Sequence, residues 1–410
     1  MRALFAIRDF RLLWTGQAVS NFGDALTNLA LLLTAQRLTG STAAVATTAV
    51  AVAMPTLLFG MVAGAYVDRW NRTRVMIVSD LFRTSFVLLF LLVTTPDRMW
   101  LLYAVAFIQA ALGTFFNPAR GALVPRIVPT DQLLAANSFS QMTQVAAGLV
   151  GTAVAGVIAA TFDTLALAYV IDAATFLISL AAIGLIRTDG APEAVPATPR
   201  IWADVRFGIA SVGRSRILLG VMIGAAIVMF GLGAVNVLLI PFIVDVLAVP
   251  ETWFAAIEAS QVVPMVLAAG LVAVLGRRLR PTSIISWALT GIGVLVAAIS
   301  LVRAPLHLML VFFAVGWLIT PLQASVSTLI QTEVQDAVRG RTGAALNTVI
   351  TAAQVSSMAL AGVAAAVMGV RGVFVLAGLI AVMSGAVTAV LFKGTAVVTA
   401  SEPAADTAAA

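Results

Sequence analysis

The first apolar stretch of the sequence carries a row of polar side chains, one of which can exchange a proton. Gln17, Asn21, Asp24 and Asn28 follow one another at steps of four, three and four residues. In a helix this spacing places all four on one face. A charged Asp at the centre of a membrane helix costs about 2.5–3.5 kcal/mol on insertion scales, so the row must face protein or water. We predict a cavity wall with Asp24 as a protonatable group; the alternative is hydrogen bonding between helices alone.

Other acids also lie inside apolar stretches of the sequence. Glu258 precedes Gln261 by one helical turn, and this pair could form a second proton or substrate site. The alternative is a Glu near the outer boundary of the membrane that reaches water. Asp172 resembles Glu258 in its setting but has less support as a functional group.

Asp80 and Arg83 stand three residues apart within one apolar stretch. Oppositely charged side chains at this spacing share a helical face and can neutralise each other. A structural ion pair is therefore the first expectation. The alternative is that Arg83 reaches Asp24 or another acid and switches partner during function. Asp24, Glu258, Arg83 and Asp80 are thus the candidates for proton coupling.

Further polar and aromatic residues could line a central cavity together with Gln17, Asn21 and Asn28. They are Gln109, Asn117, Asn236, Gln261, Trp317 and Gln323. For the aromatic Trp317, packing or a place at the membrane interface is the alternative interpretation.

Composition restricts the chain to membranes. Of the 410 residues 61% are hydrophobic and 10% are charged, whereas soluble domains carry about 25% charged residues. This excludes nucleic-acid binders and most soluble enzymes. The chain contains no Cys, a single His (His307) and no G-x-x-x-x-G-K-[ST] phosphate-binding loop. We therefore expect no metal centre, no cofactor, no use of ATP and no enzymatic activity.

Twelve apolar stretches are long enough to cross a membrane, which takes roughly 20 residues per helix. Because a backbone in lipid must satisfy its own hydrogen bonds, each is expected to be a helix. We predict an all-α membrane protein with spans at 13–37, 43–67, 74–95, 99–119, 137–161, 164–186, 217–242, 252–275, 282–302, 305–328, 343–368 and 372–392.

The charges in the loops alternate from one side to the other. One set of loops, which includes both ends of the chain, holds 19 of the 24 basic residues, and the other set holds four. Cytoplasmic loops of membrane proteins are enriched in Lys and Arg. The pattern predicts a multi-pass protein of a bacterial cytoplasmic membrane with both termini in the cytoplasm.

The chain divides into two related halves. Gly113-x-x-x-Asn117-Pro118 in the fourth span matches Gly316-x-x-x-Thr320-Pro321 in the tenth. This repeat predicts a six-helix bundle at 1–190, a cytoplasmic linker with an amphipathic helix at 191–214, a second six-helix bundle at 215–394 and a disordered tail at 395–410. Transporter halves are built in this way, with the substrate site between them.

The loop after the second span carries a specific motif. Gly64, Asp68, Arg69, Arg72 and Arg74 match the signature G-x-x-x-D-R-x-x-R-x-[RK] of the major facilitator superfamily, which the whole twelve-span chain resembles. The resemblance implies that this motif is a cytoplasmic gate. In relatives it stabilises the outward-facing state, here through Asp68 and Arg72 against the region 341–347.

Three segments resemble the third drug:proton antiporter family, which includes macrolide-efflux and enterobactin-exporter types. They lie at 8–24, 117–137 and 339–341. The resemblance implies a monomeric secondary exporter of amphipathic, drug-like or siderophore-like molecules, driven by protons through alternating access. Thr152 stands where the antiporter signature usually has Pro. A nutrient importer or facilitator, or a lysolipid flippase, would share the fold.

Overall fold

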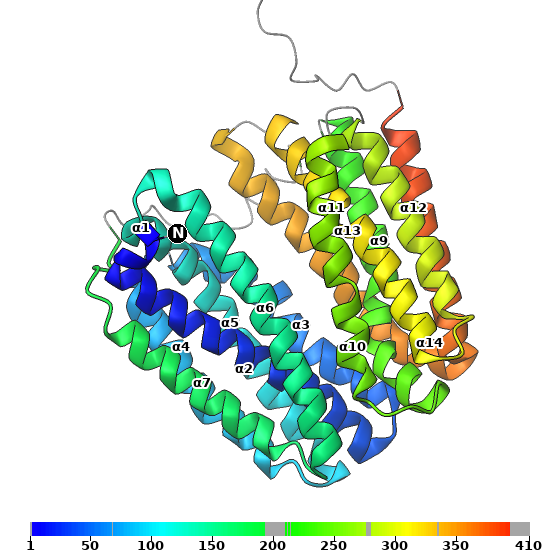
Figure 1. The fold of residues 1–410 in the computed structure, drawn as a ribbon, viewed down its shortest axis with the longest axis horizontal. Helices are drawn as coiled ribbons and strands as arrows, with labels where there is room; N and C mark the ends of the chain where they lie inside the picture. Colours follow the sequence, from blue (N-terminus) through cyan, green and yellow to red (C-terminus); the bar gives the residue numbers. More distant parts are fainter. Residues whose placement is uncertain are drawn as a thin grey trace, which may run out of the picture.

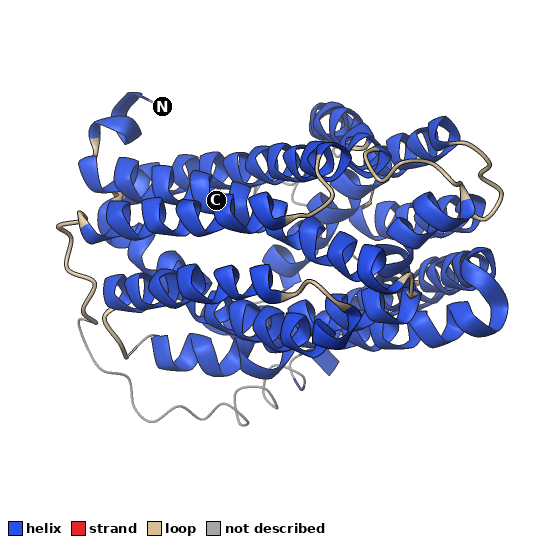
Figure 2. Ribbon diagram, turned by 90° about the horizontal axis from the view of Figure 1, so that it is seen from below, coloured by secondary structure: helices blue, strands red, loops and turns tan. Residues whose placement is uncertain are grey.

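The computed structural model describes residues 2–67, 69–192, 210, 212–213, 215–275, 280–333 and 336–393. All regular elements in these ranges are helices, joined by short loops (Figure 2). The predicted all-α membrane fold is therefore confirmed.

The helices form two bundles that follow the order of the chain (Figure 1). The first bundle contains α1 (Arg2–Ala6), α2 (Arg8–Thr39), α3 (Thr42–Val67), α4 (Arg72–Val87), η1 (Leu88–Leu92), η2 (Pro96–Arg98), α5 (Met99–Ile127), η3 (Thr130–Gln132), α6 (Leu133–Thr161) and α7 (Ala166–Gly184). The second contains α9 (Arg216–Pro241), η4 (Phe242–Val246), α10 (Trp253–Ser260), α11 (Val262–Leu275), α12 (Pro281–Ile299), α13 (Pro305–Glu333) and α14 (Asp336–Leu391).

Each of the twelve predicted spans coincides with helix. Nine helical stretches in the described ranges are long and apolar enough to cross a membrane. Two predicted spans are not among these nine stretches. The polar row makes α2 less hydrophobic, and the eighth span is divided into two short helices, α10 and α11. The last two spans run together in α14, where Gly369 has φ 72° and ψ 161° and marks the boundary between them. Only Gly adopts such a backbone conformation readily.

The predicted linker helix at 201–212 and the predicted tail lie outside the described residues, except for positions 210 and 212. Pro118 and Pro321, which the repeat relates, both lie inside helices, α5 and α13. These two helices occupy the fourth and tenth positions in the order of spans.

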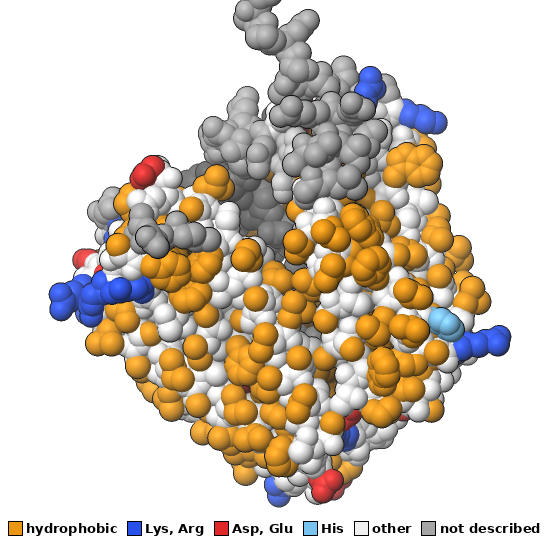
Figure 3. Space-filling model, in the orientation of Figure 1, with side chains coloured by type: hydrophobic (Ala, Val, Ile, Leu, Met, Phe, Trp, Pro, Cys, Tyr) orange, Lys and Arg blue, Asp and Glu red, His pale blue; other side chains and the backbone are white. Residues whose placement is uncertain are grey.

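The surface of both bundles is apolar, as lipid requires. Large hydrophobic side chains are highly exposed on each of them, for example Val157 at 63% and Val367 at 81%. Figure 3 shows apolar side chains spread over this face, with the charged groups near its margins. A soluble monomer does not expose apolar surface on this scale, so we assign this surface to the bilayer.

The two bundles contact each other at one end, and their helices diverge toward the other end, where α1 and the end of α14 lie (Figure 1). α3 packs against α14, and α6 packs against α10. Gly362 of α14 allows close approach, because a Cβ there would lie 3.1 Å from the Cα of Ala43. We call the contact end the far end and the other the termini end.

Candidate functional site

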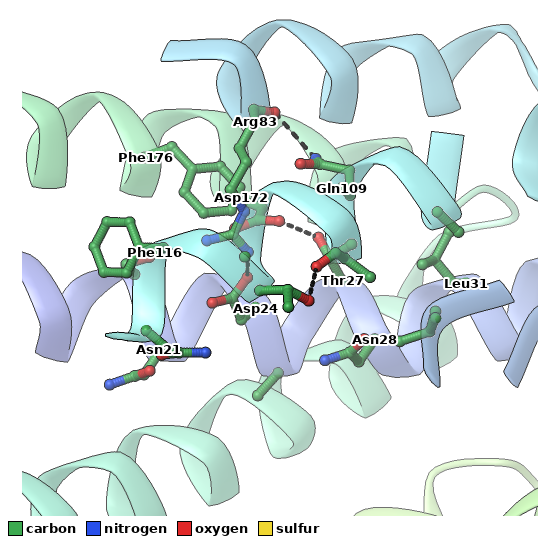
Figure 4. A pocket seen from close by; sticks show the side chains of 18 of the residues that line it. Asn21, Asp24, Thr27, Asn28, Leu31, Arg83, Gln109, Phe116, Asp172 and Phe176 are labelled. Atoms are coloured by element: carbon green, nitrogen blue, oxygen red, sulfur yellow. Dashed lines mark hydrogen bonds and ion pairs between the residues drawn. The ribbon is translucent and has the colours of Figure 1, made fainter. Parts of the chain in front are cut away.

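A cavity of about 550 Å³ lies inside the first bundle, walled by α2 to α7 (Figure 4). The structure brings a large part of the predicted site together here. Predicted residues that line it are Gln17, Asn21, Asp24, Asn28, Arg83, Gln109 and Asn117. Gln144 and Asp172 join them. Its volume is within the range of about 300–1,000 Å³ that ligand pockets occupy.

Helix α2 presents its polar row to this cavity, and glycines let the neighbouring helices pack closely against it. A Cβ at Gly23 would lie 2.2 Å from both Asp172 Oδ1 and Thr175 Oγ1 of α7. On the side of α6, Gly151 approaches the backbone of α2, where its Cβ would lie 2.3 Å from Phe22 O. Small residues allow such close packing of membrane helices.

Asp24 and Arg83 form an ion pair across the cavity, between α2 and α4 (Figure 4). The side chain of Asp24 is 34% exposed, whereas that of Arg83 is 11% exposed. The guanidinium also lies 4.1 Å from the ring centre of Phe176, a cation–π contact. Gln109 Nε2 donates to the backbone oxygen of Arg83 at 3.0 Å. The acid is thus open to the cavity, and its cationic partner is held by protein.

Asp172, which had less support from the sequence than Asp24 or Glu258, is a further acid at this site. It is buried, and it accepts hydrogen bonds from Thr27 Oγ1 at 2.6 Å and Thr175 Oγ1 at 3.1 Å. The sequence contained a signal for it. Asp172, Thr175 and Ser179 stand at steps of three and four, the same polar row that drew attention to the first span.

The expected ion pair between Asp80 and Arg83 is wrong, because Arg83 is paired with Asp24 instead. This was the alternative that the sequence left open. Asp80 is fully buried, and the hydroxyl of Ser179 on α7 lies next to its carboxylate. The three-residue spacing permitted a pair within α4, but the cavity offers Arg83 a carboxylate on the adjacent helix.

The cavity continues toward the termini end through a smaller space of about 160 Å³ between α2, α5 and α6. Gln17, Asn21 and Gln144 line both spaces. Arg120 borders the smaller one and donates to Gln17 Oε1 at 3.2 Å. The smaller space therefore adjoins the cavity that contains Asp24.

The candidates from the second half do not line this cavity. Glu258 accepts a hydrogen bond from Gln261 Nε2 at 3.1 Å beside the break between α10 and α11. Asn236 is exposed and donates to Leu232 O at 3.1 Å. Trp317 and Gln323 lie on α13, away from the cavity lining. In this conformation all the residues that line the cavity around Asp24 belong to the first bundle.

The motif after α3 contacts its own bundle. The Arg72 backbone N–H donates to Gly190 O at 2.9 Å, and the Arg74 N–H donates to Asn71 Oδ1 at 3.1 Å, which caps α4. A Cβ at Gly64 would meet nothing within 4 Å. Asp68 lies outside the described residues. Its latch with Arg72 against 341–347 stays a prediction, as do the roles of Gly64, Arg69 and Arg74.

Charged and polar side chains connect the two halves at the far end. Arg37 of α2 forms an ion pair with Glu251 and donates to Phe162 O and Asp163 O, both at 3.2 Å. Gln36 Nε2 donates to the carboxylate oxygens of Asp245 at 3.0 and 3.1 Å. These contacts join the two halves at the far end.

Comparison with known proteins agrees with this architecture. A family model described as transmembrane secretion effector, of the major facilitator type, matches residues 2–406. The chain belongs to this family. It is therefore a membrane transporter, and the predicted major facilitator resemblance is confirmed.

Curated relatives are similar to this chain over most of its length, and solved structures share its fold. Macrolide efflux protein A of Streptococcus pyogenes is 23% identical over 374 residues, covering 90% of this chain and 92% of that protein. The uncharacterized transporter YfiS of Bacillus subtilis is 26% identical over 392 residues, covering 92% and 91%. Among structures, the nucleoside transporter NupG has a TM-score of 0.77 at 12% identity and covers 93% of this chain and 100% of that one. A bacterial homologue of ferroportin has a TM-score of 0.75 at 15% identity, covering 94% and 99%.

No group of three or more His, Asp or Glu suited to a metal ion occurs in the part of the chain that the structure describes. The arrangement instead supplies one exposed carboxylate, one buried cation and one buried carboxylate. Such a set can bind and release a proton or a cationic group.

The glycine contacts lead to a first prediction. Gly23→Ala is expected to push Asp172 and Thr175 away from α2, because the new Cβ would meet both of them. Overpacking of this kind costs about 1–3 kcal/mol, and the Thr27–Asp172 hydrogen bond should be lost with it. The measurement is thermal unfolding and transport of the purified protein. Gly184→Ala, where the Cβ meets nothing within 4 Å, is the control; equal behaviour of the two variants would contradict the packing.

Proposed function

We propose that this transporter is a secondary active exporter of amphipathic small molecules and that inward movement of protons drives it. The observation that carries the proposal is the ion pair of Asp24 and Arg83 beside the buried Asp172, in a cavity that adjoins a second, smaller space. The similarity to macrolide efflux proteins supports drug-like substrates. Protons and the substrate are the ligands, and the working unit is a monomer in the bilayer.

The loop charges support the orientation. The termini end carries most of the basic residues, so it faces the cytoplasm by the positive-inside rule. The state described here then opens inward and is closed outward by Arg37 with Glu251 and by Gln36 with Asp245. An amphipathic substrate would enter the cavity from the cytoplasm or the inner leaflet.

The coupling follows from charge balance. While Asp24 is ionised it neutralises Arg83. A proton on Asp24 removes that negative charge and frees Arg83, and Asp172 is another carboxylate in the same cavity lining. A bound cationic or polar substrate competes with Arg83 for the same acid. Proton and substrate therefore exclude each other at Asp24, which is the requirement for antiport. Asp80 and Glu258 remain further candidates for proton binding.

Purified protein in liposomes tests the proposal. Uptake of a macrolide and of a fluorescent lipophilic cation into inside-out vesicles is expected to require an acidic lumen and to stop when an ionophore removes the gradient. Equal counterflow with and without a pH gradient would instead identify a facilitator. Translocation of lysolipids in place of both probes would identify a flippase.

A further inference from the structure

A second large groove lies on the outer side of the second bundle, at its termini end. It has a volume of about 760 Å³ and lies between the start of α12 and the end of α14. Figure 1 places both segments at the rim of the molecule, opposite the first bundle. The groove does not share a residue with the cavity around Asp24, so the proposed transport mechanism does not account for it.

Two cations stand in the lining of this groove. Arg280 precedes α12, and Lys393, the only lysine of the chain, follows α14. Both side chains are exposed. The ion pairs found within the described residues involve other side chains. The groove therefore offers positive charge to an anion from outside the bundle.

Apart from the cations, hydroxyl side chains of α12 and apolar residues of α14 line the groove; the hydroxyl groups belong to Thr282, Ser283, Ser286 and Thr290. Gly385, Ala386 and Ala389 of α14 form a smooth floor, and Trp287 of α12 is 77% exposed beside it. Next to the groove, Met383 and Val390 are 58% and 64% exposed, which is lipid-facing surface. Tryptophan is enriched where a membrane meets water. Positive charge at one end and an apolar channel at the other match the two parts of a phospholipid.

The repeat relates the start of α12 to the start of α4 in the first bundle. There the start of α4 is covered by the chain that follows α7. Arg72 N–H donates to Gly190 O, and Arg126 donates to Asp189 O at 3.1 Å. At the start of α12, within the described residues, the N–H groups of Ser283 and Ile284 donate to Arg280 O, and no side chain caps the helix.

We propose that this groove binds one anionic phospholipid, with its headgroup phosphate between Arg280 and Lys393 and an acyl chain along Ala386 and Ala389. The helix start adds partial positive charge in the same place. The occupant is a lipid rather than a soluble anion because the channel below the cations opens onto membrane-facing surface.

Native mass spectrometry of the delipidated protein tests this site. Phosphatidylglycerol is expected to bind more tightly than phosphatidylcholine with the same acyl chains. Each interfacial cation contributes a factor of about five in affinity, so Arg280→Gln with Lys393→Gln should weaken phosphatidylglycerol binding about 30-fold. Arg303→Gln, an exposed cation at the far end of the same bundle, should change nothing. Equal binding of the two lipids, or an unaffected double variant, would overturn the proposal.

Two further measurements separate other occupants. Ala389→Phe fills the apolar channel at an exposed position and is expected to weaken binding at least fivefold with both cations present; unchanged binding would reduce the site to surface charge and contradict the proposal. Glu402→Gln with Asp406→Asn removes the acids of the C-terminal segment. Increased lipid binding in that variant would show that the acids of the C-terminal segment normally pair with Arg280 and Lys393. Displacement by inorganic phosphate at equal concentration would assign them to a free anion, and either result would overturn the lipid site.

Discussion

Asp24→Asn is expected to reduce proton-driven export to the background of empty liposomes, while the protein still folds. Asn has the size of Asp but carries no negative charge and cannot bind or release a proton. Arg83 therefore loses its carboxylate partner on α2. Exposed ion pairs contribute about 1 kcal/mol and buried ones cost about 3–5 kcal/mol to break. Because Asp24 is one-third exposed, the loss of stability should lie between these limits. Transport driven by a pH gradient and thermal unfolding are the two measurements.

Matched variants identify the source of that effect. Asp163→Asn removes an exposed acid from a far-end loop and should leave transport intact. Asp24→Asn combined with Arg83→Gln should recover stability, because no unpaired charge remains, but should not recover coupling. Full gradient-driven export by Asp24→Asn would remove Asp24 from the mechanism.

Weakening the far-end contacts is expected to shift the protein toward its outward-open state. Glu251→Gln with Asp245→Asn removes both carboxylates that the second half offers to Arg37 and Gln36. Partly exposed charge-assisted contacts contribute about 1–2 kcal/mol each. Each substitution should therefore change the ratio of the two states roughly five- to thirtyfold. Arg37 itself keeps its bonds to Phe162 O and Asp163 O within the first half.

The absence of native cysteine makes this shift measurable by paired spin labels. Labels at Asp97→Cys and Arg303→Cys, exposed on different halves at the far end, should move apart. Labels at Asp131→Cys and Thr332→Cys, exposed at the termini end, should approach each other. Arg98→Gln is the control, because Arg98 donates only to Leu92 O of its own half at 2.8 Å. Unchanged distances in the double variant would show that apolar packing alone closes the far end.

The sequence was sufficient to predict the helices, because lipid leaves the backbone few alternatives. The span count, the break near Gly369 and the division into halves follow from hydropathy and from the repeat of Asn117-Pro118 in Thr320-Pro321. The polar row of α2 was predicted for the same reason, since such residues must avoid lipid.

The sequence could not predict which side chains form pairs between neighbouring helices. Spacing within α4 favoured Asp80 for Arg83, but which carboxylate a cation reaches depends on how closely neighbouring helices pack. Gly23 sets that distance by bringing α2 against Asp172. Because the sequence does not show how helices pack, it also could not predict where the candidates of the second half lie in this state. Asn236 and Gln323 were expected in a central cavity, but in this state only residues of the first bundle enclose the cavity around Asp24.

Accessibility of position 28 tests the central claim most directly. Asn28 is exposed and lines the cavity. In Asn28→Cys, a membrane-impermeant maleimide is expected to react from the termini side only. Adding Glu251→Gln and Asp245→Asn should move that reactivity to the far side. A residue that is unreactive from both sides in both backgrounds, or reactive from both sides at once, would contradict a polar path that opens to one side at a time.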